Sequence, residues 1–210
     1  IEESLELLGL SPEKIDYVLM THMHHDHSGG LTRVNSEGNL VSKFPNAKII
    51  VNDIEWYEMR NPNNRTRGTY LKENWEPIQD QVTTFSDSID IIPEIQMIHT
   101  SGHSNGHCII LLKQGEDTMI HMGDLMLTHV HRNPLWVPAV DDYPMKSISA
   151  KDKWLRQAFE NNYKFFFYHD QFFAVAEFDK EGKEFVNYVL RSRPPVIPFT
   201  EQQDRRPDFL

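Results

Sequence analysis

The sequence predicts one β-rich domain of mixed strand and helix content, with a metal-binding site at one rim of its scaffold. Four apolar, strand-like runs each lead to a side chain that can bind a metal ion, at His22, His103, Asp124 and His169. Residues 149 to 161 place apolar side chains on one helical stripe. No linker, repeat or low-complexity tract divides the 210 residues, a length that suffices for one sizeable core.

The first part of the chain is predicted to alternate short helices with strands. A helix is expected where apolar residues share one face behind a capping residue, and a strand where a short apolar run is bounded by polar residues. Pro77 is expected to interrupt the last helical piece. The predicted helices are 2–9, a helix beginning within 26–31, 53–59 and 70–81, and the predicted strands are 15–20 and 48–51. Residues 53–81 are interpreted as a helical insertion.

The second part is predicted to consist mainly of strands around one helix. Residues 114–117 connect two apolar runs and predict a hairpin. Residues 128–143 contain Pro134 and Pro138 and predict a loop, and the tail from Arg193 is expected on the surface. The predicted strands are 82–85, 89–92, 95–100, 108–112, 118–122, 165–168, 174–178 and 185–189, and the helix is 149–161.

Composition restricts the class of partner. The formal net charge of −10 argues against nucleic acid or an anionic membrane as a partner, because phosphate binding requires a basic surface. The single Cys108 excludes an internal disulfide, no apolar run approaches the length of a membrane span, and no signal peptide is visible, so we predict a cytoplasmic protein. The oligomeric state is left open, with a homodimer as one option.

The histidine-rich segment predicts a site for two metal ions. His22 and His24 are two residues apart, so at an extended strand end both side chains leave the same side of the backbone. Asp26 and His27 then turn toward a second ion as the chain enters a helix. Later ligands must complete both sites, and a carboxylate can bridge two ions because it has two oxygens. Asp124 is the candidate for that bridge, with His103 and His169 as further ligands. An accidental cluster of histidines is the competing interpretation.

The segment His22-Met23-His24-His25-Asp26-His27, followed by His103, Asp124 and His169, resembles the signature of the metallo-β-lactamase superfamily. Within that superfamily the chain is most similar to the N-acyl-homoserine lactonases, and closest to the YtnP-like quorum-quenching type. The stretches 15–22, 70–76 and 141–145 carry this closer resemblance, which spans most of the chain.

The resemblance implies an α+β fold, an αββα sandwich, with residues 1–210 as a single domain. It also implies that His22, His24 and His103 hold one metal ion, that Asp26, His27 and His169 hold the other, and that Asp124 bridges them. We expect two divalent ions, Zn²⁺ in the first place, although histidine and carboxylate ligands also accept manganese, cobalt or iron.

Two departures from the family pattern stand out. The fold normally begins with several strands before the histidine-rich loop, so either about 60 or more upstream residues are absent or one sheet is short. We favour absence, which makes the domain N-terminally incomplete and without its first strands. The better-known lactonases carry a substrate-contacting tyrosine where this chain has Leu127, and His129 is the candidate to replace that contact.

The expected function is hydrolysis of the lactone ring of N-acyl-homoserine lactones, which is quorum quenching. A hydroxide that bridges the two metal ions would attack the carbonyl, and Asp26 or Asp124 would protonate the leaving alkoxide. The same site could instead act on phosphotriesters, aryl esters or β-lactams. Two further alternatives are an iron redox protein with a flavin partner and a non-catalytic binding module, although the complete ligand set argues against the latter.

Aromatic residues are candidates for the substrate pocket. Trp136 and Tyr143 in the 128–143 loop, together with Trp56 and Trp75, could line a pocket for the acyl chain, and ordinary packing explains each of them equally well. His107 is interpreted as structural, Cys108 as buried, and the basic residues of the insertion as a solvated face. Those basic residues are Arg60, Arg65, Arg67 and Lys72.

Overall fold

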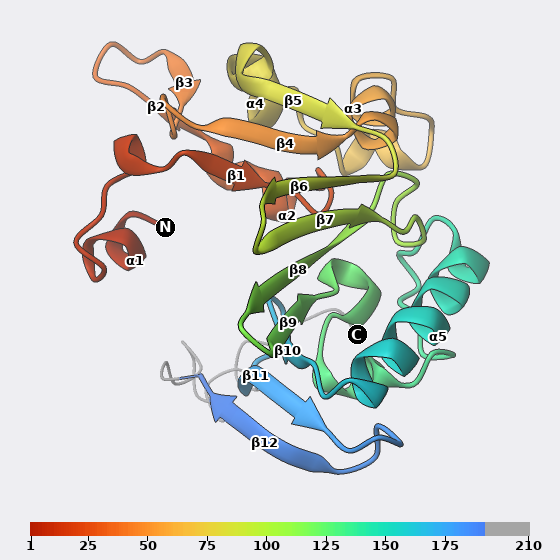
Figure 1. Ribbon diagram of the computed structural model, residues 1–210. Coiled ribbons are helices and arrows are strands. Elements are labelled where there is room, and N and C mark those ends of the chain that lie inside the picture. Colours follow the sequence, from red (N-terminus) through yellow and green to blue (C-terminus); the bar gives the residue numbers. More distant parts are fainter. Residues whose placement is uncertain (192–210) are drawn as a thin grey trace, which may run out of the picture.

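The computed structural model describes residues 1–191 and shows four layers in the order helix, sheet, sheet, helix (Figure 1). Helix α3 (Asp53–Arg60) covers a small sheet, with α4 (Lys72–Trp75) nearby, and α5 (Pro144–Glu160) covers a large one. Ahead of them, the short helix α1 (Glu2–Glu6) lies near the N-terminus. This order of layers confirms the expected αββα sandwich.

The large sheet contains seven strands within residues 1–191, in the order β12-β11-β10-β9-β8-β7-β6. Only β9 and β10 run parallel among its neighbouring pairs in this described part, and a crossover that includes α5 joins them. Their C-terminal ends therefore lie at the same edge of the sheet. The strands are β6 (Ser88–Ile92), β7 (Ile95–His99), β8 (Cys108–Gln114), β9 (Asp117–His121), β10 (Lys164–Phe166), β11 (Phe173–Phe178) and β12 (Phe185–Leu190).

The small sheet is parallel and, in the described part of the chain, consists of β1, β4 and β5. Its strand order is β1-β4-β5, and a separate hairpin, β2–β3, lies beside it (Figure 1). Because β1 sits at the edge, the loop that follows it is free to turn toward the large sheet. The bounds are β1 (Tyr17–Leu19), β2 (Thr32–Val34), β3 (Leu40–Ser42), β4 (Lys48–Asn52) and β5 (Val82–Phe85).

Alternation along β4 builds two layers of the core. Ile49 and Val51 pack with Trp56 of α3, whereas the intervening Ile50 packs between the sheets with Met97. Successive side chains of a strand point to opposite faces, so one apolar run of this length serves both layers. The run is therefore continuous in apolar residues rather than alternating.

The same alternation in β8 joins the large sheet to α5. Ile110 belongs to the layer between the sheets, while Ile109 and Leu111 pack against Trp154 and Leu155 of the helix. These side chains are buried, and they fix α5 against the large sheet. The helix N-terminus then reaches the loop that carries His103.

Gly102 permits this close approach between α5 and the His103 loop. Its φ angle is +114°, a conformation that residues with a side chain rarely adopt. A Cβ atom at this position would lie 2.7 Å from Ser147 Oγ and 2.9 Å from Ser147 Cα. The glycine therefore lets the first turns of α5 pack directly on the backbone next to His103.

Several boundaries differ from the sequence-based predictions. Helix α5 begins at Pro144 rather than at 149, because proline is well suited to the first turn of a helix. The β2–β3 hairpin was not predicted. The helical piece expected over 70–81 is the short α4 followed by a 3-10 helix, Glu76–Gln81, with its proline in the first turn. The division into one domain with an insertion at 53–81 stays a prediction, and the tail from Arg193 lies outside the described residues.

No helix within residues 1–191 is both long enough and apolar enough to pass through a membrane.

Candidate metal centre

Four strand ends deliver the predicted ligands to one place. His22 and His24 follow β1, and His103 lies in the connection from β7 to β8. Asp124 follows β9, in the 3-10 helix Gly123–Met126, and His169 follows β10. The site therefore lies at one rim of the sheets and is built from loops that follow rigid strands. Side chains on such loops can converge without interrupting the hydrogen bonds of the sheet.

The local backbone separates the histidine-rich segment into two directions. His24 is extended, with φ −57° and ψ 151°, and the helix α2 (His25–Ser28) begins immediately after it. His22 and His24 thus lie on the extended part, whereas Asp26 and His27 lie on the helical turn. The Ser28 hydroxyl donates toward the carbonyl oxygens of Met23 and His24 at 3.1 and 3.0 Å and holds this change of direction.

Three buried imidazoles form the first cluster, which we call the three-histidine group: His22, His24 and His103. His24 Nδ1 lies 3.0 Å from His103 Nε2, and the His22 ring centroid lies 4.6 and 4.8 Å from those of His24 and His103. Each residue has one nitrogen within 4.8 Å of the others. Three lone-pair donors thus converge on one small volume.

The second cluster, which we call the four-residue group, combines two carboxylates with two imidazoles: Asp26, His27, Asp124 and His169. The Nε2 atoms of His27 and His169 are 3.2 Å apart. Asp26 Oδ2 lies 3.5 and 3.6 Å from these two nitrogens. The cluster is partly open to solvent on the Asp26 side.

Asp124 connects the two groups through its two oxygens. Oδ1 lies 3.2 Å from His27 Nε2 and 3.4 Å from His169 Nε2, in the four-residue group. Oδ2 lies 3.4 Å from His103 Nε2 and 3.9 Å from His22 Nε2, in the three-histidine group. Each oxygen therefore faces one cluster, the geometry that a bridging carboxylate requires.

The donor atoms fit metal ions better than they fit one another. His22 Nε2 and Asp124 Oδ1 are buried and have no hydrogen-bond partner among residues 1–191, which is costly for polar atoms. Tetrahedral zinc with nitrogen ligands at about 2.0–2.1 Å separates those ligands by roughly 3.3 Å. The contacts of 3.0 to 3.4 Å between His24 and His103, His27 and His169, and His169 and Asp124 are close to that spacing.

Electrostatics favours the metal-binding protonation states of His22, His24 and Asp124. Burial lowers the pKa of His22 well below its usual value, and burial with the neighbouring His103 lowers the pKa of His24 to about 3. Both imidazoles are therefore neutral at pH 7 and keep a lone pair. Burial tends to raise the pKa of Asp124, but the adjacent imidazoles of His169 and His27 hold it well below its usual value, so this carboxylate is ionised.

A second layer of residues orients the ligands. His103 Nδ1 lies 2.9 Å from Asp141 Oδ1, which leaves Nε2 to face the cluster. The backbone N–H of Asp124 donates to His107 Nε2 at 3.1 Å, and Thr21 Oγ1 lies 3.1 Å from His22 Nδ1. The structural role predicted for His107 is thus to hold the Asp124 turn, and His107 is itself fully buried.

Glu55 ties both ligand loops to helix α3. Its fully buried carboxylate accepts hydrogen bonds from the Met23 backbone N–H at 2.8 Å, the Ser104 hydroxyl at 2.6 Å and the Tyr70 hydroxyl at 3.0 Å. Met23 stands between His22 and His24. Burial raises the pKa of Glu55, and the three donors oppose that effect. Sequence reasoning did not identify this glutamate.

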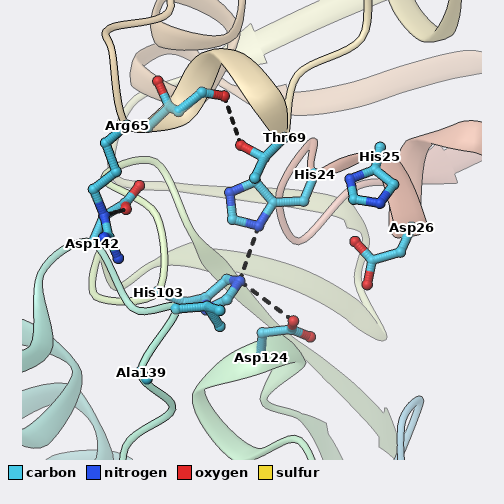
Figure 2. A pocket seen from close by; sticks show the side chains of 11 residues that line it. His24, His25, Asp26, Arg65, Thr69, His103, Asp124, Ala139 and Asp142 are labelled. Carbon is cyan, nitrogen blue, oxygen red and sulfur yellow. Dashed lines mark hydrogen bonds and ion pairs between the residues drawn. The ribbon is translucent and has the colours of Figure 1, made fainter. Parts of the chain in front are cut away.

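A cavity of about 410 Å³ opens onto the two groups, with His24, His103 and Asp124 on its inner side (Figure 2). Asp26 lies at one side of the view, and Arg65 and Asp142 lie at the other. The remaining lining residues come from helix α2, from the helical segment after β4 and from the loop before α5. They are His25, Thr66, Thr69, Ala139 and Val140.

The predicted substrate contacts do not line this cavity. His129 is held by Asp170, with its Nδ1 2.6 Å from Oδ2, and its ring packs against Phe173. Trp136 is exposed and lines a separate hollow with Arg132, and Tyr143 lies at the start of α5 beside the Gly102 backbone. Their role in substrate binding stays a prediction.

The remaining aromatic candidates, Trp56 and Trp75, pack edge to face with centroids 6.0 Å apart, and Trp56 is buried in the core. Arg65 is exposed, as expected for a solvated face, and it also pairs with Asp142 and lines the cavity. Cys108 is buried, as predicted.

Comparison with known proteins identifies the class. Residues 1–169 match the family model of the metallo-beta-lactamase superfamily, and the chain belongs to that superfamily. An N-acyl homoserine lactonase from Bacillus cereus is 29% identical over 116 residues, which is 55% of this chain and 40% of that protein. The chain thus spans about two fifths of the length of this curated relative.

Solved structures agree on the fold. The structure of a probable metal-dependent hydrolase from Staphylococcus aureus is 39% identical, covers 93% of this chain and 69% of its own, and superimposes with a TM-score of 0.87. AidC, a dizinc quorum-quenching lactonase in complex with a product, is 19% identical, with 92% and 70% coverage and a TM-score of 0.74. The second likeness bears on the fold alone.

Proposed function

We propose that the chain forms a dinuclear metal centre, with Zn²⁺ as the expected ion, that hydrolyses the lactone ring of N-acyl-homoserine lactones. The observation that carries the proposal is Asp124, whose two oxygens face two separate clusters of metal-binding side chains. The lactonase names of several relatives support the choice of substrate class. We retain a homodimer and a cytoplasmic location as predictions.

The chain's own residues can perform the steps that ester hydrolysis requires. Two bound divalent ions would supply an activated water near neutral pH and polarise the carbonyl. Asp26, whose side chain is 46% exposed, lines the cavity and can pass a proton to the leaving ring oxygen. Asp124 is buried with both oxygens against imidazoles, so we assign proton delivery to Asp26 and bridging to Asp124.

A kinetic panel on the metal-loaded protein tests the substrate class. Ring opening of N-hexanoyl-homoserine lactone is followed beside hydrolysis of a phosphotriester, an aryl ester and a β-lactam, with metal content measured on the same sample. We expect the lactone to have the highest kcat/KM. A higher value for any of the other three would replace the lactone as the substrate class.

Asp26→Asn tests the assignment of the two carboxylates. The amide cannot donate a proton as the acid does, so we expect kcat for the lactone to fall by about 10²-fold or more. Turnover is measured together with metal content per chain. Asp152→Asn, which changes an exposed carboxylate on α5, is the matched control. Full metal content with full turnover in Asp26→Asn would remove Asp26 from both metal binding and proton transfer.

A further inference from the structure

Arg65 is the one lysine or arginine among the residues that line the cavity, all of which lie in the described part of the chain. The other charged lining residues are the carboxylates Asp26, Asp124 and Asp142, besides the histidines. Figure 2 shows Arg65 on the opposite side of His103 from Asp26. The cavity therefore has an arginine paired with a carboxylate at one end and the carboxylate of Asp26 at the other.

The guanidinium of Arg65 is held in a fixed orientation. Its Nε donates to Asp142 Oδ1, and its Nη2 donates to the backbone carbonyl of Asp141 at 3.1 Å. The same two residues contact His103, because Asp141 Oδ1 lies 2.9 Å from Nδ1 and the Asp142 N–H donates to the His103 carbonyl at 3.0 Å. Asp141 and Asp142 each contact both Arg65 and His103, and they thus position Arg65 relative to the three-histidine group.

These contacts leave donors for a ligand. An arginine side chain has five N–H donors, and within residues 1–191 the hydrogen bonds of the Arg65 guanidinium engage only Nε and Nη2. The side chain is 56% exposed, whereas its partner Asp142 is 12% exposed. Nη1 therefore has no partner in the described part of the chain, and it belongs to a residue that lines the cavity.

We infer that Arg65 determines specificity by donating a hydrogen bond from Nη1 to the amide carbonyl oxygen of an N-acyl lactone. This inference rests on the proposed function. The acylamino group of such a lactone is attached to the carbon next to the scissile carbonyl, so its oxygen must lie beside the metal ligands but outside them. Arg65 is the lining residue whose position and charge satisfy both conditions.

The test compares two lactones that differ in the acylamino group. N-hexanoyl-homoserine lactone carries it, and γ-butyrolactone lacks it. In Arg65→Met we expect kcat/KM for the first to fall at least about tenfold, as one lost charge-assisted hydrogen bond implies, while the value for the second changes less than about twofold. Arg65→Lys keeps the positive charge but loses the planar guanidinium. Its kcat/KM for N-hexanoyl-homoserine lactone should lie between those of the parent protein and Arg65→Met.

Arg67→Met is the matched control, because Arg67 is exposed in the same segment and does not line the cavity. Melting temperature and metal content are measured for every variant. A parallel fall for both lactones in Arg65→Met and in Arg65→Lys would show that Arg65 only braces the loop, and unchanged kinetics would equally overturn the inference. If the metal-loaded parent protein opens neither lactone, the proposed function fails and the inference fails with it.

Discussion

The two ligand groups differ in how closely the protein encloses them. The side chains of His22 and His103 are 0% and 2% exposed, whereas those of Asp26 and His169 are 46% and 30% exposed. The first group is built from loops that pack under the α5 N-terminus and α3. Of the second group, Asp26 and Asp124 line the cavity. The two groups, which Asp124 connects, thus have different access to water.

Their supporting contacts differ in the same direction. His103 is oriented by the buried Asp141, and the loop of His22 and His24 is tied down by Glu55. On the open side, the support of Asp26 is a hydrogen bond from the Tyr168 hydroxyl to its backbone carbonyl at 3.2 Å. We interpret the three-histidine group as the anchoring half of the centre and the four-residue group as the half that exchanges water and substrate.

Asp124→Ala should have the largest effect, because it removes the carboxylate whose two oxygens face the two groups. We expect loss of at least one metal ion per chain and a fall in kcat of about 10³-fold or more, since neither half is then complete. Metal content and turnover are measured on the same preparation. Normal content of both ions with near-normal turnover would show that the two groups do not depend on a common carboxylate.

The strand ends could be predicted from the sequence, and most of their supports could not. His22, His103, Asp124 and His169 each follow an apolar run, so local pattern was enough to place them at one rim. Asp141 supports His103 from 38 residues away, and Glu55 bonds Met23 from 32 residues away. Nothing in the residues around an isolated aspartate or glutamate indicates such a partner.

The position of Arg65 in the cavity wall was likewise not predictable from the sequence. Basic residues in a helical segment usually face solvent, and the sequence offered no sign of Asp142, which lies 77 residues further on. The substrate contacts proposed for aromatic residues depended on the conformation of loops, which the pattern of apolar and polar residues does not specify. The fold class was predictable because the apolar periodicity and the ligand motif agreed. The cavity wall was not predictable, since it forms from segments that are distant in sequence.

Asp141→Asn should have a smaller effect, confined to the three-histidine group. The amide weakens the hydrogen bond that orients His103, and changes of this kind typically cost about 10- to 100-fold in metal affinity or activity. Competition with a chelator measures the affinity of each ion in turn. Asp90→Asn, at an exposed position on β6, is the control. Equal weakening of both ions would contradict the division between an anchoring and an open half.

Lys151 on α5 should show the smallest effect, because it acts on the loop that leads to Asp141 rather than on a ligand. Its buried ammonium donates to the carbonyls of Asn133 and Trp136 at 2.9 and 2.6 Å, and burial lowers its pKa from 10.5 to about 8. Between these two pH values the unfolded chain binds more protons than the folded chain. The free energy of unfolding therefore rises with pH through this window.

Lys151→Met removes that titration, so the difference in unfolding free energy between the parent protein and the variant isolates the contribution of Lys151. Relative to the variant, the parent protein should gain about 1.5 kcal/mol in the free energy of unfolding between pH 8 and pH 9.5. Urea unfolding at several pH values measures both proteins under matched conditions, and titrations elsewhere in the chain cancel in the comparison. Parallel stability curves would mean that the lysine keeps an ordinary pKa in the folded protein, and that the loop carrying Asp141 is less tightly enclosed than the anchoring half requires.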